Sequence, residues 1–184
     1  MKNKIVYDYY EDSKEIFSFL KDYDWPVYLC SNHKIFENQR YDIITCSPIK
    51  KIYSYIDKTI IESNGTKEEY HDDPIKILTD IMKDYHSDIT DLPFTGGAIG
   101  YMSYDLGNIY EKIDFKIKDL DMPLMAFGIY DWVIIIDHLE KNTVLLYDNQ
   151  TSLIDLIRDN LEKRNFKKYV SKKFSIDSNC ISNL

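Results

Sequence analysis

The segment PFTGGAIGYMSYDLGNIYEKI, residues 93–113, combines closely spaced glycines with a run of tyrosines. A dinucleotide-binding turn needs G-x-G-x-x-G between a strand and a helix, but Thr95 stands in the place of the first glycine. A P-loop must end in G-K-S or G-K-T, whereas Tyr101 follows Gly100. We therefore interpret the glycines as residues that allow a tight turn and close packing of strands. They are Gly96, Gly97 and Gly100.

Working outward from this segment, short apolar runs separated by turn residues predict strands. The runs cover residues 5–9, 25–31, 41–48, 51–57, 58–63, 124–138 and 143–148. Asn64-Gly65 is a turn signal, and LEKN at 139–142 predicts a hairpin turn. Gly128, inside the long run 124–138, indicates a bulge or a close backbone approach.

Helical spacing of apolar residues predicts three helices, at 13–23, 71–86 and 152–164. The expected caps are Asp12 or Ser13 for the first helix, Asp73 followed by Pro74 for the second, and Ser152 with Asp155 as a capping box for the third. Because strands come in runs and helices are few, we expect an α+β fold of largely antiparallel sheets with about three flanking helices.

Composition narrows the classes of function. The net charge of -8 over 184 residues argues against a nucleic-acid partner. No apolar run is long enough to cross a membrane, and the N-terminal residues do not form a signal peptide, so a cytoplasmic location is expected. The three cysteines and four histidines show no metal-ligand spacing, so no metal site is expected. They are Cys30, Cys46, Cys180, His33, His71, His86 and His138.

Catalytic motifs are equally scarce. Ser31 ends an apolar strand, a position from which a hydroxyl can reach a ligand, but no G-x-S-x-G motif surrounds it. Acidic pairs lie at turns and helix starts, where solvent and the helix dipole account for them. Taken residue by residue, the sequence predicts an α+β domain without a catalytic constellation of its own.

The segment 93–111 resembles the P-F-x-G-G-x-x-G-x-x-x-Y-D-L-x-x-x-x-E pattern of component I of the chorismate-utilising synthases, the anthranilate synthase component I family. This pattern includes Tyr104 and Asp105, which we group with the three glycines as a structural motif. WPVYLCS, RYDIITCSP, DDPIKILTDIM and MPLMAFGIYDWVIIIDH agree with the family in order and spacing. The resemblance thus covers nearly the whole chain.

The resemblance implies that residues 1–174 are the N-terminal domain of such an enzyme and 175–184 a tail or the start of a linker. The chorismate-binding domain, which carries the catalytic groups and the Mg²⁺ ligands, would be missing, so neither a cofactor nor catalytic residues are expected in this chain. RYDII and GIYDW look like the aminodeoxychorismate synthase branch, which makes the precursor of para-aminobenzoate and folate with ammonia from a glutamine amidotransferase subunit. The alternatives are anthranilate synthase component I and a stand-alone amino-acid-binding module.

Family members also bind tryptophan in this domain, at a strand end followed by a polar loop. Carried over by position, the effector pocket would comprise Ser31, Asn38, Gln39, Arg40 and Tyr41. Ser31 would bind polar atoms of the ligand and Tyr41 would stack on the indole. Cys30 replaces the acidic residue or histidine that the family places before the serine. We therefore expect weak or no tryptophan binding.

Overall fold

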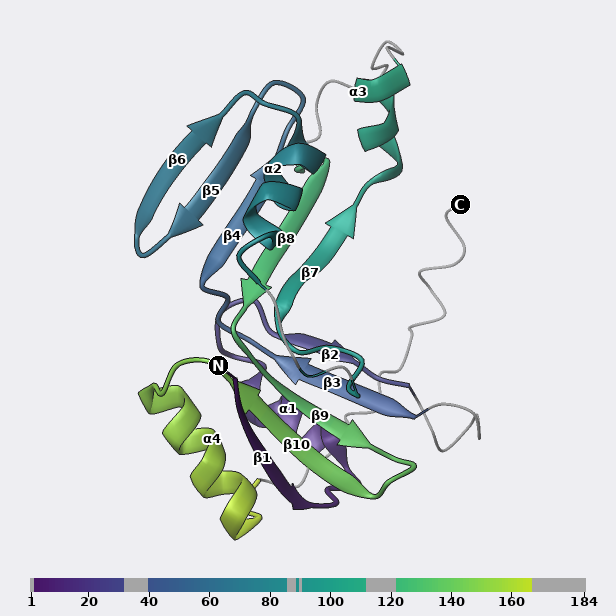
Figure 1. Ribbon diagram of the computed structural model, residues 1–184, viewed down its shortest axis with the longest axis vertical. Helices are drawn as coiled ribbons and strands as arrows, with labels where there is room; N and C mark the ends of the chain where they lie inside the picture. Colours follow the sequence, from purple (N-terminus) through teal and green to yellow (C-terminus); the bar gives the residue numbers. More distant parts are fainter. Residues whose placement is uncertain (1, 32–39, 86–88, 90, 112–121, 167–184) are drawn as a thin grey trace, which may run out of the picture.

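The computed structural model describes residues 2–31, 40–85, 89, 91–111 and 122–166. These residues form two five-stranded sheets with helices packed on them, one sheet above the other in Figure 1. Neighbouring strands are antiparallel throughout both sheets. The predicted α+β class with largely antiparallel sheets is confirmed.

The first sheet, in the lower half of Figure 1, has the strand order β1-β10-β9-β3-β2. Its strands are β1 (Asn3–Asp8), β2 (Val27–Leu29), β3 (Tyr41–Thr45), β9 (Trp132–Asp137) and β10 (Asn142–Tyr147). β9 and β10 are buried along almost their whole length, because apolar layers cover both faces of the sheet. Burial on both faces explains why these strands are unbroken apolar runs rather than alternating ones.

The second sheet has the strand order β6-β5-β4-β8-β7. Its strands are β4 (Lys50–Ser54), β5 (Thr59–Ser63), β6 (Thr66–Tyr70), β7 (Gly97–Met102) and β8 (Met125–Tyr130). β6, with the sequence TKEEY, is absent from the sequence-based prediction because it carries almost no apolar residues. Its place at the sheet edge, where four of its five residues are exposed, explains this polar composition.

The long strand predicted at 124–138 is two strands that belong to different sheets. β8 ends at Tyr130 and β9 begins at Trp132, so the chain passes from one sheet to the other at Asp131. The backbone carbonyl of Asp131 accepts a hydrogen bond from the amide of Asp148 at 3.0 Å, and its carboxylate accepts one from Asn149. These contacts fix Asp131, the buried residue between β8 and β9, against the residues that follow β10.

The described residues form four helices where about three were predicted. They are α1 (Ser13–Leu20), α2 (Pro74–Met82), α3 (Gly107–Glu111) and α4 (Ser152–Lys163), and a short 3-10 turn, η1 (Tyr104–Leu106), precedes α3. Asp12 caps α1 through Lys14 N and Asp73 caps α2 through Lys76 N, in agreement with the sequence.

The cap of α4 differs from the prediction by one residue. The backbone of Thr151 is extended and its hydroxyl accepts a hydrogen bond from Ile154 N at 3.2 Å, whereas Ser152 is already the first helical residue. A residue in helical conformation cannot serve as the N-cap. The capping box expected from Ser152 and Asp155 is therefore wrong.

Three apolar clusters hold these elements together. One lies between α1, α4 and one face of the first sheet, and another lies between α2 and the second sheet. The third covers the other face of the first sheet, where Ile89, Leu92 and Phe94 pack on buried residues of β9 and β10. The segment that precedes β7 thus closes the core of the first sheet.

The glycine-rich segment contains the turn into β7 and its first residues. Gly96 and Gly97 have φ of 106° and 117°, which side chains rarely tolerate. A Cβ on Gly100 would lie 2.0 Å from the carbonyl oxygen of Ala126 on β8. Gly128 pairs without interruption with Lys51 and Ile99, so the expected bulge is wrong, and the close neighbour there is the ring of Tyr130.

Candidate functional site

Ser31, the first residue predicted for a ligand pocket, lies just beyond the end of β2 and beside β3. Its amide donates to Asp42 Oδ1 at 2.8 Å, and its hydroxyl donates to the same oxygen at 3.1 Å. Asp42 is 1% exposed. The conformation at this strand end is therefore set by a buried carboxylate on the neighbouring strand.

Asp42 is the centre of a wider group of polar side chains. Ser13, in the first turn of α1, donates to Asp42 Oδ2 at 2.5 Å and is 2.6 Å from the hydroxyl of Tyr28. His138 Nε2, at the end of β9, lies 3.1 Å from Asp42 Oδ2, and Tyr9 lies 2.8 Å from His138 Nδ1. We call Tyr9, Ser13, Tyr28, Ser31, Asp42 and His138 the Asp42 cluster.

The electrostatics of the cluster favour an ionised Asp42. Burial alone would raise the pKa of this carboxyl, but the hydrogen bonds from Ser13 and Ser31 and the neighbouring His138 outweigh burial and hold the pKa below its ordinary value. Because the Ser31 hydroxyl donates to Asp42, its lone pairs are left for hydrogen-bond donors. The arrangement gives Ser31 a fixed position, and because the pKa of Asp42 is lowered, this carboxylate is a weak base for activating the Ser31 hydroxyl as a nucleophile.

Arg40, the second predicted residue, is committed to an ion pair. Its Nε and Nη2 donate to the carboxylate of Asp137 at 2.6–3.0 Å, and Asp137 also accepts from the amides of Leu139 and Glu140. The guanidinium lies over the ring of Tyr41, 4.7 Å from its centre. Arg40 thus ties the start of β3 to the β9–β10 turn.

Tyr41 does not face the Asp42 cluster. Neighbouring residues of a strand point to opposite faces of the sheet. Tyr41 packs with Ile43 on the cluster formed by β9 and β10, whereas Asp42 meets Ser13 of α1. The structure therefore does not bring Ser31 and Tyr41 together in one cavity.

The remaining predicted residues are the two loop residues of the candidate pocket and the five residues of the structural motif. Asn38 and Gln39 lie outside the described residues. Gly96, Gly97 and Gly100 lie in and before β7, and the motif continues into η1, where Tyr104 is 96% exposed and Asp105 is also exposed. The structural motif lies in the second sheet and the candidate pocket in the first.

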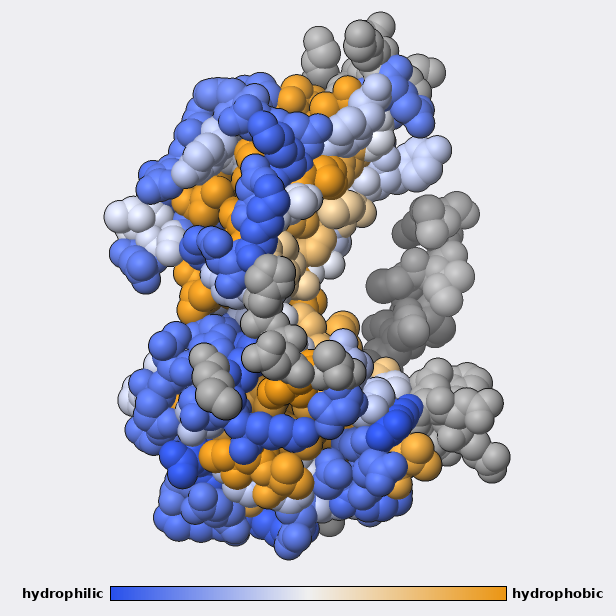
Figure 2. Space-filling model, in the orientation of Figure 1, coloured by the Kyte–Doolittle hydropathy of each residue, from blue (hydrophilic) through white to orange (hydrophobic). Residues whose placement is uncertain are grey.

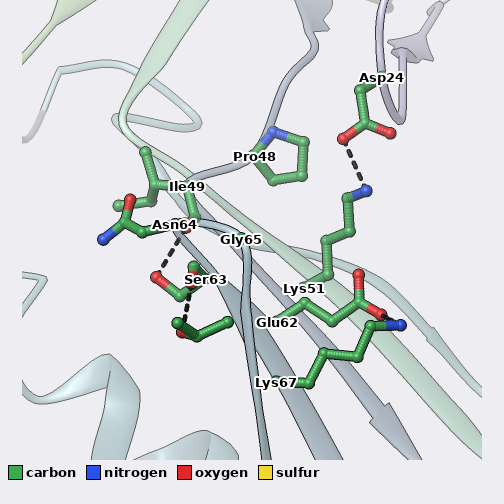
Figure 3. A pocket seen from close by; sticks show the side chains of 10 residues that line it. Asp24, Pro48, Ile49, Lys51, Glu62, Ser63, Asn64, Gly65 and Lys67 are labelled. Atoms are coloured by element: carbon green, nitrogen blue, oxygen red, sulfur yellow. Dashed lines mark hydrogen bonds and ion pairs between the residues drawn. The ribbon is translucent and has the colours of Figure 1, made fainter.

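Among the residues that the structure describes, two shallow pockets lie elsewhere, and none of the predicted site residues described there lines either. The first, about 270 Å³ in volume, lies beside the β5–β6 turn (Figure 3). Its lysines are paired, Lys51 with Asp24 at 2.7 Å and Lys67 with Glu62 at 2.5 Å. The second, about 290 Å³, lies between the β4–β5 turn and the start of α2, where Tyr110 donates to Asp73. In the first pocket these pairs neutralise the charge of both lysines.

Within the described part of the chain, no group of three or more histidine, cysteine or acidic side chains is arranged to hold a metal ion. None of the helices described there has the length and apolar character that a membrane span requires.

Comparison with known proteins finds relatives of this chain. No family model matches it. It is 30% identical over 181 residues to aminodeoxychorismate synthase component 1 of Escherichia coli (strain K12), an alignment that covers 95% of this chain and 38% of that protein. It is 38% identical over 106 residues to anthranilate synthase component 1 of Acetivibrio thermocellus, covering 55% and 22% of the two chains.

The chain is homologous to these two synthase components. It spans 38% of the length of its Escherichia coli relative. The crystal structure of anthranilate synthase component I from Streptococcus pneumoniae TIGR4 has the same fold over 71% of this chain and 31% of that one, with a TM-score of 0.52 and 23% identity. The motif in residues 93–111 thus led to proteins that the chain resembles over 95% of its length.

Sequence reasoning missed the residues that organise this synthase homologue around Ser31. In the sequence, Asp42 stands out only as the aspartate of the RYDII motif, and His138 only as one of four histidines without metal-ligand spacing. The signal that could have revealed Asp42 is a charged residue at a position between apolar residues of a buried strand, because such a charge is rarely buried without partners.

Proposed function

We propose that this chain is the N-terminal, non-catalytic domain of a chorismate-utilising synthase, of the aminodeoxychorismate synthase component I type. The observation that carries this proposal is the 30% identity that extends over 95% of the chain. The contacts of the charged residues support a structural role. Asp42 of β3 contacts Ser13 of α1 and His138 after β9, and Arg40 pairs with Asp137 at the β9–β10 turn. These charges therefore join β3 to α1 and to the β9–β10 turn.

The complete enzyme would convert chorismate and ammonia to 4-amino-4-deoxychorismate, with the ammonia supplied by a glutamine amidotransferase subunit, in the cytoplasm. This chain would contribute the scaffold against which the chorismate-binding domain packs. It would not turn over chorismate alone.

In this proposal, Mg²⁺ would bind to the part of the enzyme that this chain does not span. The ion prefers several oxygen ligands in near-octahedral geometry. The described acidic residues do not offer such a set, since they do not gather in groups of three or more with other metal-ligating side chains. We therefore assign no role in metal binding to the described residues of this chain.

Tryptophan would bind this chain weakly or not at all. The hydroxyl of Ser31 is already bonded to Asp42, Arg40 is bonded to Asp137, and Tyr41 packs on the other face of the sheet. The Ser31 hydroxyl keeps lone pairs that could accept a hydrogen bond from a ligand ammonium. A complete indole pocket would need walls from outside the described residues.

Anthranilate synthase component I is the second candidate, supported by the 38% identity over 106 residues to the Acetivibrio thermocellus protein. The two candidates differ in product, since anthranilate is fluorescent and aminodeoxychorismate needs a lyase to release para-aminobenzoate. A stand-alone amino-acid-binding module is the candidate from outside the enzymes, and micromolar binding of tryptophan in calorimetry would favour it.

The proposal is tested by co-expressing this chain with the portion of the Escherichia coli synthase component that it does not match. Chorismate loss is then measured with Mg²⁺ and ammonia. We expect no turnover by this chain alone and turnover when both parts are present, with aminodeoxychorismate as the product. Turnover by the chain alone, or the absence of turnover by the pair, would contradict the proposal.

A further inference from the structure

The two sheets have four edge strands, and three of them carry features that discourage pairing with another strand. Edge strands expose unpaired backbone groups, and proteins protect them with charge or by keeping them short. β6 carries Lys67, Glu68 and Glu69 on its exposed positions. β1 carries Lys4 and ends at Asp8, and β2 has three residues.

Among the strands that the structure describes, β7 is the edge strand without such protection. Its sequence, GAIGYM, contains neither a charged residue nor proline, and it pairs with β8 residue by residue over its full length. In Figure 2 blue, hydrophilic residues cover much of the upper left, over β6, whereas pale and orange residues lie over β7. A regularly paired, neutral edge of six residues is suited to accept a further strand.

Large side chains are exposed along and beyond this edge. Tyr101 is 41% exposed and Met102 49%, and Tyr104, which follows in η1, is 96% exposed. Tyr110 of α3 is 46% exposed, and Met122, before β8, is 61% exposed. Exposed apolar and aromatic groups on a sheet edge and in the segments next to it favour a contact surface there.

We propose that β7 pairs with a strand from the part of the synthase that this chain does not span, extending the second sheet beyond β7. The proposal rests on the proposed function. It is supported by the alignment, in which 95% of this chain matches 38% of the Escherichia coli relative, so that most of that relative has no counterpart here. A second copy of the chain fits less well, because each copy carries a net charge of -8 and the two would repel.

The test uses the co-expressed pair described above, with the unmatched portion of the Escherichia coli component carrying an affinity tag. The variant Tyr101→Lys/Met102→Lys places two charges on the β7 edge at exposed positions. The matched control, Thr66→Lys, places a charge on β6, the opposite edge of the same sheet, where Thr66 is also exposed. Thermal melting of each variant alone checks that it folds.

We expect the wild-type chain and Thr66→Lys to co-purify with the tagged portion, and the β7 variant to bind at least tenfold more weakly. Hydrogen exchange of residues 97–102 should slow at least tenfold in the complex, while exchange in β6 stays unchanged. A complex that survives the β7 variant with unchanged affinity, no complex at all, or a dimer of this chain built on β7 would overturn the proposal.

The same experiment separates the two proposals. A complex that forms through β7 but does not consume chorismate leaves the interface standing and removes the proposed function. A pair that consumes chorismate regardless of the β7 variant keeps the function and removes the interface.

Discussion

Asp42 shows at the scale of single residues how much of the first sheet depends on one buried charge. Its carboxylate accepts from Ser13 and Ser31 and faces His138, so it joins α1, the end of β2 and the end of β9. Hydrogen bonds to a buried ionised group are stronger than neutral ones. The Ser31 strand end therefore has a conformation set before any ligand arrives.

Replacing this charge should destabilise the protein. Asp42→Asn keeps the shape of the side chain but removes the charge opposite His138, and we expect a loss of about 3 kcal/mol in the free energy of unfolding. Denaturant unfolding followed by circular dichroism measures it. Asp8→Asn, an exposed aspartate at the end of β1, is the control and should change stability by less than about 0.5 kcal/mol. Equal stability of the two variants would show that Asp42 is not essential.

Asp137 should make stability depend on pH. Burial would raise the pKa of its carboxyl, but Arg40 and the amides of Glu140 and Leu139 lower it below the ordinary value. A carboxyl with a lowered pKa stabilises the fold above the unfolded value of about 3.9, and this contribution is lost as the pH falls through the folded value. Melting temperatures between pH 3 and 7 should therefore fall less steeply below about pH 5 in Asp137→Asn than in the wild type. Parallel curves would rule out this coupling.

Gly100 offers a test of backbone packing. An alanine there would place Cβ 2.0 Å from the carbonyl oxygen of Ala126, so Gly100→Ala should destabilise the protein by about 3 kcal/mol or more. Gly107→Ala is the matched control, because nothing lies within 4 Å of its Cβ position and its backbone is helical. We expect that variant to be neutral or slightly stabilising in thermal melts. A neutral Gly100→Ala would mean that β7 and β8 can separate there at little cost.

Secondary-structure elements were predictable where local chemistry decides them. α1 and α2 follow from apolar spacing and from Asp12 and Asp73, residues whose effect is confined to one helical turn. The division of 124–138 into β8 and β9 was not predictable, because the apolar run continues on both sides of Asp131 and only the partners of each strand decide where it bends. Strand partners are a property of the whole chain and leave little local signal.

The cap of α4 gives an element-scale prediction. Thr151→Ala should cost about 1 kcal/mol in unfolding free energy, because the amide of Ile154 loses its acceptor. Ser152→Ala, the next residue along the chain, should be close to neutral, since serine has no capping role inside the helix. Chemical denaturation of both variants measures the difference. The reverse ranking would restore the capping box that the sequence alone suggested.

At the scale of the whole molecule, the family motif gave the fold, but the candidate site could be predicted only in part. Ser31 and Arg40 were identified, yet their partners Asp42 and Asp137 were not, and Arg40 and Asp137 are 97 residues apart in the chain. Contacts of that separation depend on the sheet order β9-β3-β2, which no local pattern encodes. For the same reason the separation of Ser31 and Tyr41 by the sheet could not be foreseen.

The strand order of the first sheet also sets when the protein can fold during its synthesis. β1 has β10 as its neighbour, and β9, the central strand, is made only a few residues before β10. At about 5–20 residues per second, a ribosome needs on the order of ten seconds to reach β10 after releasing β1. Over that interval Ile5, Val6 and Tyr7 have no strand to pair with. The apolar side chains of the segment that becomes β1 therefore stay without their strand partner until translation supplies β10.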